Sequence, residues 1–258
     1  MHKSVSIIGY GWLGAFLAEH YKKLRCPIKA STTSPAKLQG IHEKGFRAHL
    51  FDLTTGIEET DTLLNSSIHF LCIPPSKLNG NYAECLMQYV SRTAKGTKIV
   101  FISSTSVYPK ENGLWHEESP VLTNNMTEAE KAITNYTENY LILRCAGLFG
   151  PERDPAFFLS GKSGLSGMGS TVSLVHVLDI CRISGRLIQK DLRGVFNMGL
   201  TAPYRKKELY SRACIKRGIP VPEFNEQNES VERYISSEKA IAATECGFDH
   251  TQNWFESL

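Results

Sequence analysis

Apolar residues along this chain occur in short blocks whose internal spacing alternates between two patterns. Short apolar or β-branched runs predict buried strands, and between most of them apolar positions recur every three or four residues, which predicts helices. Such alternation is typical of parallel strands joined by right-handed crossovers, so we predict an α/β protein with a doubly wound parallel sheet. The predicted strands lie at 4–8, 27–31, 46–52, 68–75, 98–104 and 140–150, and the predicted helices at 12–24, 82–96 and 127–140.

The pattern changes after Pro151, where a stretch rich in glycine and serine precedes less regular elements. A helix is predicted at 177–188, a strand at 194–199 and a helix at 206–218. We therefore expect a nucleotide-binding core at 1–150. The remainder, 151–258, is expected to form a smaller C-terminal region that covers the cleft on the substrate side, with some segments returning to the core.

The first strand ends in three glycines, Gly9, Gly11 and Gly14, within the sequence "SVSIIGYGWLG". A secretion signal would need an uninterrupted apolar stretch, which these glycines break. A G-x-G-x-x-G turn between a strand and a helix instead predicts a dinucleotide site of the Rossmann type. The first glycine permits the tight turn, the second lets a pyrophosphate approach, and the third allows the helix to pack on the strand.

The end of the second strand bears on which dinucleotide binds. An NAD site usually has an acidic residue about 20 residues beyond the glycines, to hold the ribose 2′-hydroxyl. Here no acid occurs from Ala30 to Gln39. Hydroxyl and ammonium donors take its place, and a Ser-Pro pair begins the next helix. We expect NADP or NAD as cofactor, with NADP slightly favoured. The predicted cofactor-binding residues are Gly9, Gly11, Trp12, Leu13, Gly14, Thr32, Thr33, Ser34, Lys37, Asp52, Leu53, Ile73, Pro74, Pro75 and Ser103.

Composition narrows the classes of partner. The chain has 258 residues, 29 basic and 26 acidic, with no basic tract and no run long enough to span a bilayer, so we expect neither nucleic acid nor a membrane as partner. Seven cysteines without C-x-x-C spacing argue against disulfides or structural zinc, and the histidines form no ligand cluster. We expect a cytoplasmic protein without a metal, acting on a small molecule.

A cluster of hydroxyls follows the fifth strand, in "SSTSVY" at 103–108. Together with "GYGWLG", "LRCAGLFGPERDP", "LVHVLD" and "VFNMG" in the same order, it resembles the extended short-chain dehydrogenase/reductase family, the NAD(P)-dependent epimerase/dehydratase group. The resemblance implies that Ser104, three residues before the Val of the Val-Tyr pair, holds the reacting oxygen. The alternative is that these serines only end a strand and cap a loop.

The chain departs from that family at its general base, a tyrosine followed four residues later by lysine. None of the ten tyrosines has lysine at that position. Tyr108 is a candidate catalytic residue, although a phenol without a nearby cation keeps a pKa near 10 and packing is its other interpretation. Glu128 and Glu130 lie where the pair would be. They are interpreted mainly as the first turn of a helix, in which Thr127 is the cap and Glu130 completes a T-x-x-E capping box.

Two further residues are candidates for substrate contact. Arg153, in "GPERDP", could bind an anion at the mouth of the cleft, and His176 belongs to an H-x-x-D segment that leads into a late helix. Two hypotheses on function follow. One is an oxidoreductase or epimerase acting on a hydroxyl-bearing substrate, which could be a nucleotide-sugar; the other is a non-catalytic NAD(P)-binding redox sensor or regulatory partner. Both are compatible with a monomer or a homodimer.

Overall fold

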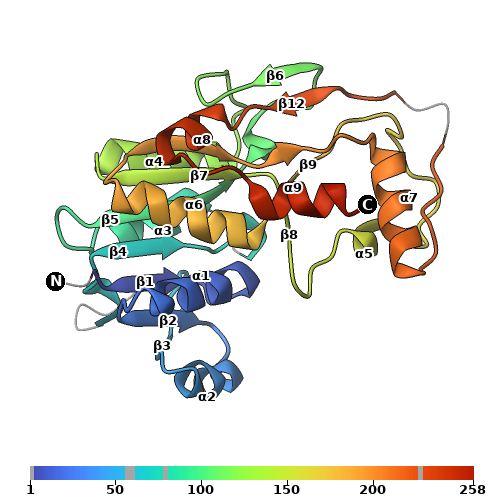
Figure 1. The fold of residues 1–258 in the computed structure, drawn as a ribbon. Helices are drawn as coiled ribbons and strands as arrows, with labels where there is room; N and C mark the ends of the chain where they lie inside the picture. Colours follow the sequence, from blue (N-terminus) through green and yellow to red (C-terminus); the bar gives the residue numbers. More distant parts are fainter. Residues whose placement is uncertain (1–2, 56–61, 78–80, 226–228) are drawn as a thin grey trace. The chain divides into compact units, whose positions relative to one another are not determined.

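The computed structural model describes residues 3–55, 62–77, 81–225 and 229–258, and these form two compact units (Figure 1). Each unit is assembled from segments that alternate along the chain. The first takes in one segment from beyond residue 150, and the second takes in residues 108–121 and 144–150 from before it. The first unit comprises Met1–Val107, Leu122–Leu143 and Leu187–Val195; the second comprises Tyr108–Val121, Arg144–Arg186 and Phe196–Leu258.

A seven-stranded sheet confirms the predicted fold class. Its order is β10-β7-β5-β4-β1-β2-β3, and the pairs β1–β2, β1–β4, β2–β3 and β4–β5 are parallel. The chain moves outward in one direction from β1 and in the other from β4, which makes the space between these two strands the topological switch point of a doubly wound sheet. The strands are β1 (Val5–Ile8), β2 (Ile28–Thr32), β3 (Arg47–Leu50), β4 (Ile68–Leu71), β5 (Lys98–Ser104), β7 (Tyr140–Cys145) and β10 (Gly194–Met198).

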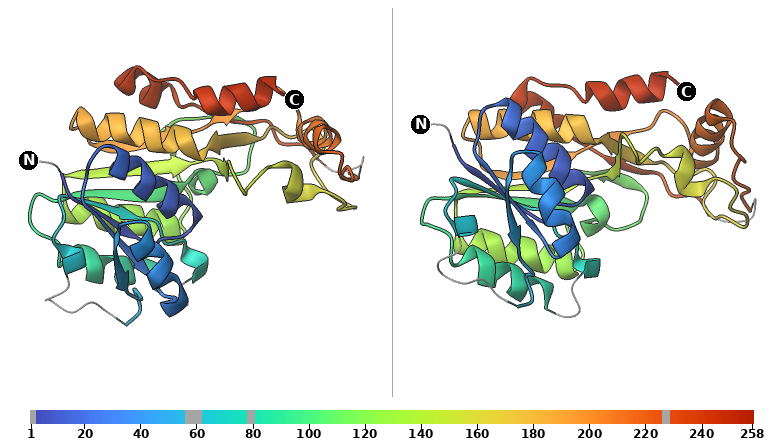
Figure 2. Two further views of the ribbon diagram at one scale, coloured as in Figure 1. Left: turned by 60° about the horizontal axis from the view of Figure 1, so that its bottom comes forward. Right: turned by 90° about the horizontal axis from the view of Figure 1, so that it is seen from below.

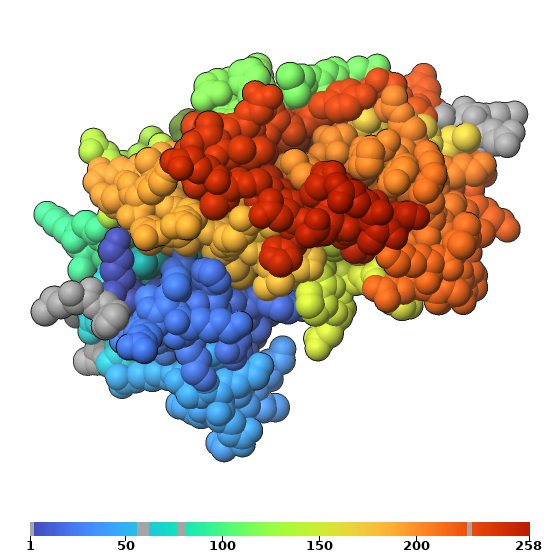
Figure 3. Space-filling model, in the orientation of Figure 1, coloured from blue at the N-terminus to red at the C-terminus, as the bar shows by residue number. Residues whose placement is uncertain are grey.

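Helices of the first unit cover both faces of its part of the sheet, as Figure 2 shows. Helices α1 and α2 lie on one face and the neighbouring pair α3 and α4 on the other; α1 and α2 form the blue surface in Figure 3. The bounds are α1 (Trp12–Lys23), α2 (Pro35–Glu43), α3 (Tyr82–Val90) and α4 (Asn125–Tyr136), with short 3₁₀ turns η1 (Thr62–Leu64), η2 (Pro75–Lys77) and η3 (Thr105–Val107).

The start of α4 differs from the prediction. The helix begins at Asn125, and Asn124 is its cap: the Asn124 side chain accepts hydrogen bonds from the amides of Met126 and Thr127 at 2.9 and 3.1 Å. Thr127 completes the capping box from the third helical position, by accepting the Asn124 amide. The predicted box from Thr127 to Glu130 was therefore wrong, because the asparagine three residues earlier forms the box instead.

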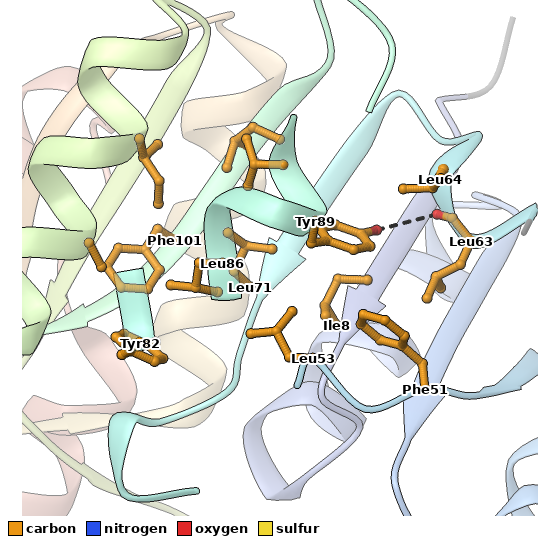
Figure 4. Close-up of a cluster of buried hydrophobic side chains, with 14 of the residues drawn as sticks. Ile8, Phe51, Leu53, Leu63, Leu64, Leu71, Tyr82, Leu86, Tyr89 and Phe101 are labelled. Atoms are coloured by element: carbon orange, nitrogen blue, oxygen red, sulfur yellow. Dashed lines mark hydrogen bonds between the residues drawn. The ribbon is translucent and has the colours of Figure 1, made fainter. Parts of the chain in front are cut away.

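The core of the first unit fills the space between the sheet and the α3–α4 pair (Figure 4). Aromatic and branched side chains from β1, β4, β5, α3 and α4 meet there, and the largest are Tyr82, Tyr89 and Phe101. Burial of a side chain of this size is worth about 2 to 3 kcal/mol, so this cluster anchors the strand ends that carry the turns.

A buried histidine lies beside that core. His69 on β4 is fully buried, its Nδ1 lies 2.6 Å from the Tyr89 hydroxyl and its Nε2 lies 3.1 Å from the Ser66 carbonyl oxygen. Burial lowers the pKa of His69 to about 4, so the ring is neutral in the folded protein.

The second unit contains two small sheets and several helices. The predicted strand at 140–150 divides here: β7 ends at Cys145, and β8 begins at Gly147 and pairs with β9 in a separate three-stranded sheet. A core around Phe149, Leu209 and Phe255 holds the unit together. Its elements are β6 (Gly113–Trp115), β8 (Gly147–Phe149), β9 (Ser173–His176), β11 (Leu200–Thr201), β12 (Arg233–Ile235), α5 (Ala156–Leu159), α7 (Lys206–Arg217), α8 (Glu238–Thr244) and α9 (Asp249–Glu256); α6 (Val177–Gln189) runs from the second unit into the first.

Across the described residues, none of the helices has both the length and the apolar character that crossing a bilayer requires.

Candidate functional site

The three glycines of the turn after β1 have different surroundings. Gly9 has φ +96°, a conformation that strongly favours glycine, and a Cβ on it would approach Ile73 at 2.9 Å. A Cβ on Gly14 would overlap the carbonyl oxygen of Gly9. At Gly11 a Cβ would meet nothing within 4 Å. The first and third glycines are thus required by the fold, whereas the second faces open space.

Helix α1 begins at this turn with its N-terminal amides uncapped. Gly11 is the N-cap, so it offers no side-chain acceptor, and the first turn contains no acidic residue. The amide groups at a helix start and the positive end of the helix dipole favour an anion at such a terminus. Because Gly11 leaves the space above the turn open, a phosphate group has room to reach these amides.

A pocket of about 360 Å³ opens beside the turn, at the carboxyl ends of β1, β2 and β4. Its position at the switch point between β1 and β4 is where open α/β sheets bind ligands, and its volume lies in the range of small-molecule sites. The wall consists of the loops that follow β1, β3 and β4, the end of β2 with the residue after it, and the first turn of α2: Gly9, Tyr10, Gly11, Ser31, Thr32, Thr33, Lys37, Phe51, Asp52, Leu53, Cys72, Ile73 and Pro74.

The β2 end of this pocket has hydroxyls and one lysine. Thr32 Oγ1 accepts a hydrogen bond from the Ser34 amide at 3.2 Å, and Lys37 lies in the first turn of α2. Ser34 is the N-cap of α2, yet its side chain makes no capping hydrogen bond, and the first turn again has no acidic residue. Two uncapped helix starts therefore flank one pocket.

The β3 end of the pocket, next to the β2 end, presents one carboxylate. Asp52 Oδ1 accepts hydrogen bonds from the Thr54 amide at 2.8 Å and from the Thr54 hydroxyl at 2.7 Å. These bonds lower the pKa of Asp52, so the group is ionised at neutral pH. The carboxylate is held in place by its own turn and can accept from a ligand amine or hydroxyl.

Nine of the predicted cofactor-binding residues line the pocket, and six do not. Those outside it are Trp12, Leu13 and Gly14 in α1, Ser34 at the α2 cap, Pro75 in η2 and Ser103 at the end of β5. Whether the fifteen contact a cofactor stays a prediction. Four lining residues were missed by the sequence analysis, although each adjoins a predicted one: Tyr10, Ser31, Phe51 and Cys72.

The serine cluster contains two hydroxyls with different surroundings. Ser103 is buried, and its hydroxyl donates to Glu130 Oε1 on α4 at 2.5 Å. Ser104 is half-buried, and its Oγ accepts the Ser106 amide at 3.1 Å, which leaves the hydroxyl proton available for a ligand oxygen. Glu130 is therefore a buried partner of the β5 end, rather than the member of a capping box that the sequence suggested.

Tyr108, the other candidate catalytic residue, lies in the second unit and is fully buried. Its hydroxyl donates to Asn197 Oδ1 at 2.8 Å and accepts from Arg144 Nη1 at 2.9 Å, while its ring stacks on Trp115. Burial raises the pKa of Tyr108, although Arg144 opposes that shift. The placement favours the packing interpretation.

The two candidate substrate residues lie in different surroundings within the second unit. Arg153 is exposed, with its guanidinium 6.0 Å from the Phe158 ring centre. His176 is half-buried and stacks on His250 at 5.3 Å; burial, and secondarily His250, lower its pKa. The structure does not bring them into one described pocket, and their contact with a substrate stays a prediction.

Asp179, three residues after His176, is a structural partner of α9. Its carboxylate accepts the amides of His250 and Thr251 at 3.2 and 2.8 Å and the Thr251 hydroxyl at 2.7 Å, and it pairs with Arg182. It is fully buried. The acid that the sequence placed at the start of α6 thus caps a different helix, as a charge near a helix N-terminus should.

We compared the sequence and the structure of the chain with those of known proteins. No family model matches the chain. Its sequence is 27% identical to protein YeeZ of Escherichia coli K12 over 265 residues, which covers 96% of each chain. UDP-glucuronic acid 4-epimerase from Bacillus cereus, solved in complex with NAD, superposes with a TM-score of 0.72 at 15% identity, covering 98% of this chain and 99% of that one. The chain has the fold of an NAD-dependent epimerase.

A conserved protein of unknown function from Silicibacter pomeroyi shares the same fold, with a TM-score of 0.77 at 18% identity over 99% of this chain and 98% of that one. At such identities the likeness concerns the fold. Function has to be argued from the residues of the site itself.

Proposed function

We propose that the chain binds a nicotinamide dinucleotide in the pocket beside the glycine turn. The observation that carries this proposal is the pairing of an uncapped, acid-free α1 N-terminus with the open space above Gly11. The pyrophosphate would be held by the α1 amides, and the adenosine half by the β2 and β3 ends. Asp52 supplies an ionised acceptor on that side, suited to the adenine amine or a ribose hydroxyl.

NADP is the favoured form of this cofactor. Thr32, Thr33 and Lys37 line the β2 end of the pocket, where an NAD site would have an acid. A carboxylate there would repel a 2′-phosphate, whereas hydroxyls, an ammonium group and the uncapped α2 start all attract one.

The reaction proposed is oxidoreduction or epimerisation of a hydroxyl-bearing substrate, and a nucleotide-sugar fits the fold's known relatives. When bound, the nicotinamide accepts or returns a hydride. Ser104 would orient the substrate oxygen, because its Oγ accepts the Ser106 amide and its proton can be donated. The Tyr-x-x-x-Lys pair is absent from the sequence, so the substrate proton goes to water, to a substrate group or to another side chain, and turnover is slow.

A second function, a redox sensor that binds NAD(P) without turnover, is favoured by one observation: the phenol that follows the serine cluster is buried and bonded to Arg144 and Asn197. In that case a partner would read whether the pocket holds the oxidised or the reduced cofactor. The protein would act in the cytoplasm, as a monomer or homodimer.

Turnover distinguishes the two functions. A panel of nucleotide-sugars and simple alcohols is assayed by nicotinamide absorbance, and by an epimer assay, because a returned hydride leaves no net change in absorbance. For an enzyme, Ser104→Ala removes most of the activity, whereas the matched control Ser106→Ala, which keeps the amide that Ser104 accepts, retains it. Binding of NADP without turnover on any substrate supports the sensor instead.

A further inference from the structure

Ser31, on β2, ties the glycine turn to the adenosine side of the pocket. Its hydroxyl oxygen accepts the Gly9 amide at 2.9 Å, and its carbonyl oxygen accepts the Tyr10 amide at 2.7 Å. The last ladder pair between β1 and β2 is Ile7–Ala30, so these two bonds continue the pairing past the end of the ladder and into the turn.

The Ser31 hydroxyl can also donate a hydrogen bond, and this proton is available to a ligand. Only 1% of the residue is exposed, and it lines the pocket between Gly9 and Thr32. Its oxygen is occupied as an acceptor, while its proton has no hydrogen-bond acceptor among the residues the structure describes. A buried donor without a partner costs free energy, and that cost disappears when a ligand oxygen accepts the proton. Accepting the Gly9 amide also polarises the hydroxyl and strengthens it as a donor.

We propose that Ser31 is a binding and positioning residue for the nucleotide. Its hydroxyl donates to an oxygen on the 2′ side of the adenosine ribose, while the same oxygen fixes the Gly9 amide. The inference rests on the proposed function and adds a residue to the site. A donor in place of the usual acidic acceptor calls for a ligand rich in acceptor oxygens, which is the chemistry of a 2′-phosphate.

In this role, Ser31 would affect the binding of two parts of the ligand, the pyrophosphate and the adenosine. A phosphate held by the α1 start and an adenosine held at the β2 end would both depend on the position of one hydroxyl. A residue that only tethered the turn would affect the pyrophosphate and leave the adenosine unaffected. The two roles therefore predict different results with a ligand that has no pyrophosphate.

The test uses adenosine 2′-monophosphate and NADP, titrated into the whole protein by calorimetry. Ser31→Ala is expected to weaken both ligands by about three- to tenfold, the loss of one hydrogen bond, and Ser31→Thr to restore both to within about twofold. Ser66→Ala is the matched control: Ser66 is a buried serine of the same unit that accepts the Ser6 hydroxyl and lies outside the pocket, so binding should be unchanged.

If Ser31→Ala does not fold, Ser31→Thr and Ser31→Val provide a second pair of matched shape, of which only threonine keeps the hydroxyl. Unchanged affinity for adenosine 2′-monophosphate in Ser31→Ala or Ser31→Val, or no binding of that ligand by the unmodified protein, overturns the inference even where NADP binds. Failure of the unmodified protein to bind NADP or NAD at all overturns the proposed function itself.

Discussion

Gly14 in α1 lies against the carbonyl oxygen of Gly9, so closely that a Cβ on Gly14 would overlap that oxygen. The contact brings the start of the helix down onto the turn that it follows. Gly11, three residues earlier, adopts φ −90° and ψ −161°, which any residue can adopt, and nothing lies within 4 Å of its would-be Cβ. Two glycines of one motif therefore respond differently to substitution.

Gly14→Ala should destabilise the fold, because a backbone oxygen cannot move aside as a flexible side chain can. Overpacking of this kind costs about 1 to 3 kcal/mol. Gly11→Ala should leave the free energy of unfolding within about 0.5 kcal/mol of the original value. Urea unfolding of the two variants measures both, and equal losses would show that the turn does not pack as described.

The protein should lose stability as the pH falls from about 6.5 towards 4. The pKa of His69 is about 4 in the folded protein and near 6.5 in the unfolded chain, so over this window the unfolded state binds the proton more readily. Stability is fully retained well above pH 6.5, and the loss amounts to about 3 kcal/mol by pH 4. Urea midpoints across this pH range should fall less steeply for His69→Gln; an identical slope would contradict the prediction.

Tyr108→Phe should cost stability more than binding or rate. Removing the hydroxyl leaves the buried Arg144 and Asn197 groups each without one partner, a loss of about 1 to 3 kcal/mol. Tyr136→Phe is the control, because the Tyr136 hydroxyl donates to the Ser91 carbonyl at the surface and its loss should have little effect. A large fall in turnover with unchanged unfolding would instead identify Tyr108 as catalytic.

Lys37→Glu should weaken NADP more than NAD, since it places a negative charge beside the expected 2′-phosphate. Lys95→Glu, an exposed change of the same charge in the same unit, controls for the net charge of the protein. Calorimetry with both cofactors gives the selectivity. Strong preference of the unmodified protein for NAD would show that the β2 end does not bind a phosphate.

Periodicity and glycine spacing predicted the strands that surround the switch point, because both are local consequences of the backbone. The partners of buried polar groups could not be predicted in the same way. Glu130 lies 27 positions from Ser103 along the chain, and Asp179 lies 71 and 72 positions from the two amides it caps. Such contacts depend on how crossovers bring distant segments together, which no local pattern encodes.

The same limit applies to the pocket. Ser31 and Cys72 adjoin predicted residues, yet only the ends of paired strands reveal that they share one wall. The sequence assigned the turn and the β2 end to one dinucleotide site, from the known spacing between the glycines and the ribose-binding position. Their meeting around one pocket comes from the order of β2, β1 and β4 in the sheet.

Calorimetric titration of NADP and of NAD into the purified protein, after removal of any retained nucleotide, tests the central claim most directly. The account predicts binding at one site per chain, and its loss in Gly11→Val, whose side chain would fill the space above the turn while the unfolding transition stays unchanged. Equal affinity of the unmodified protein and a folded Gly11→Val for both cofactors, or no binding of either cofactor by the unmodified protein, would contradict it.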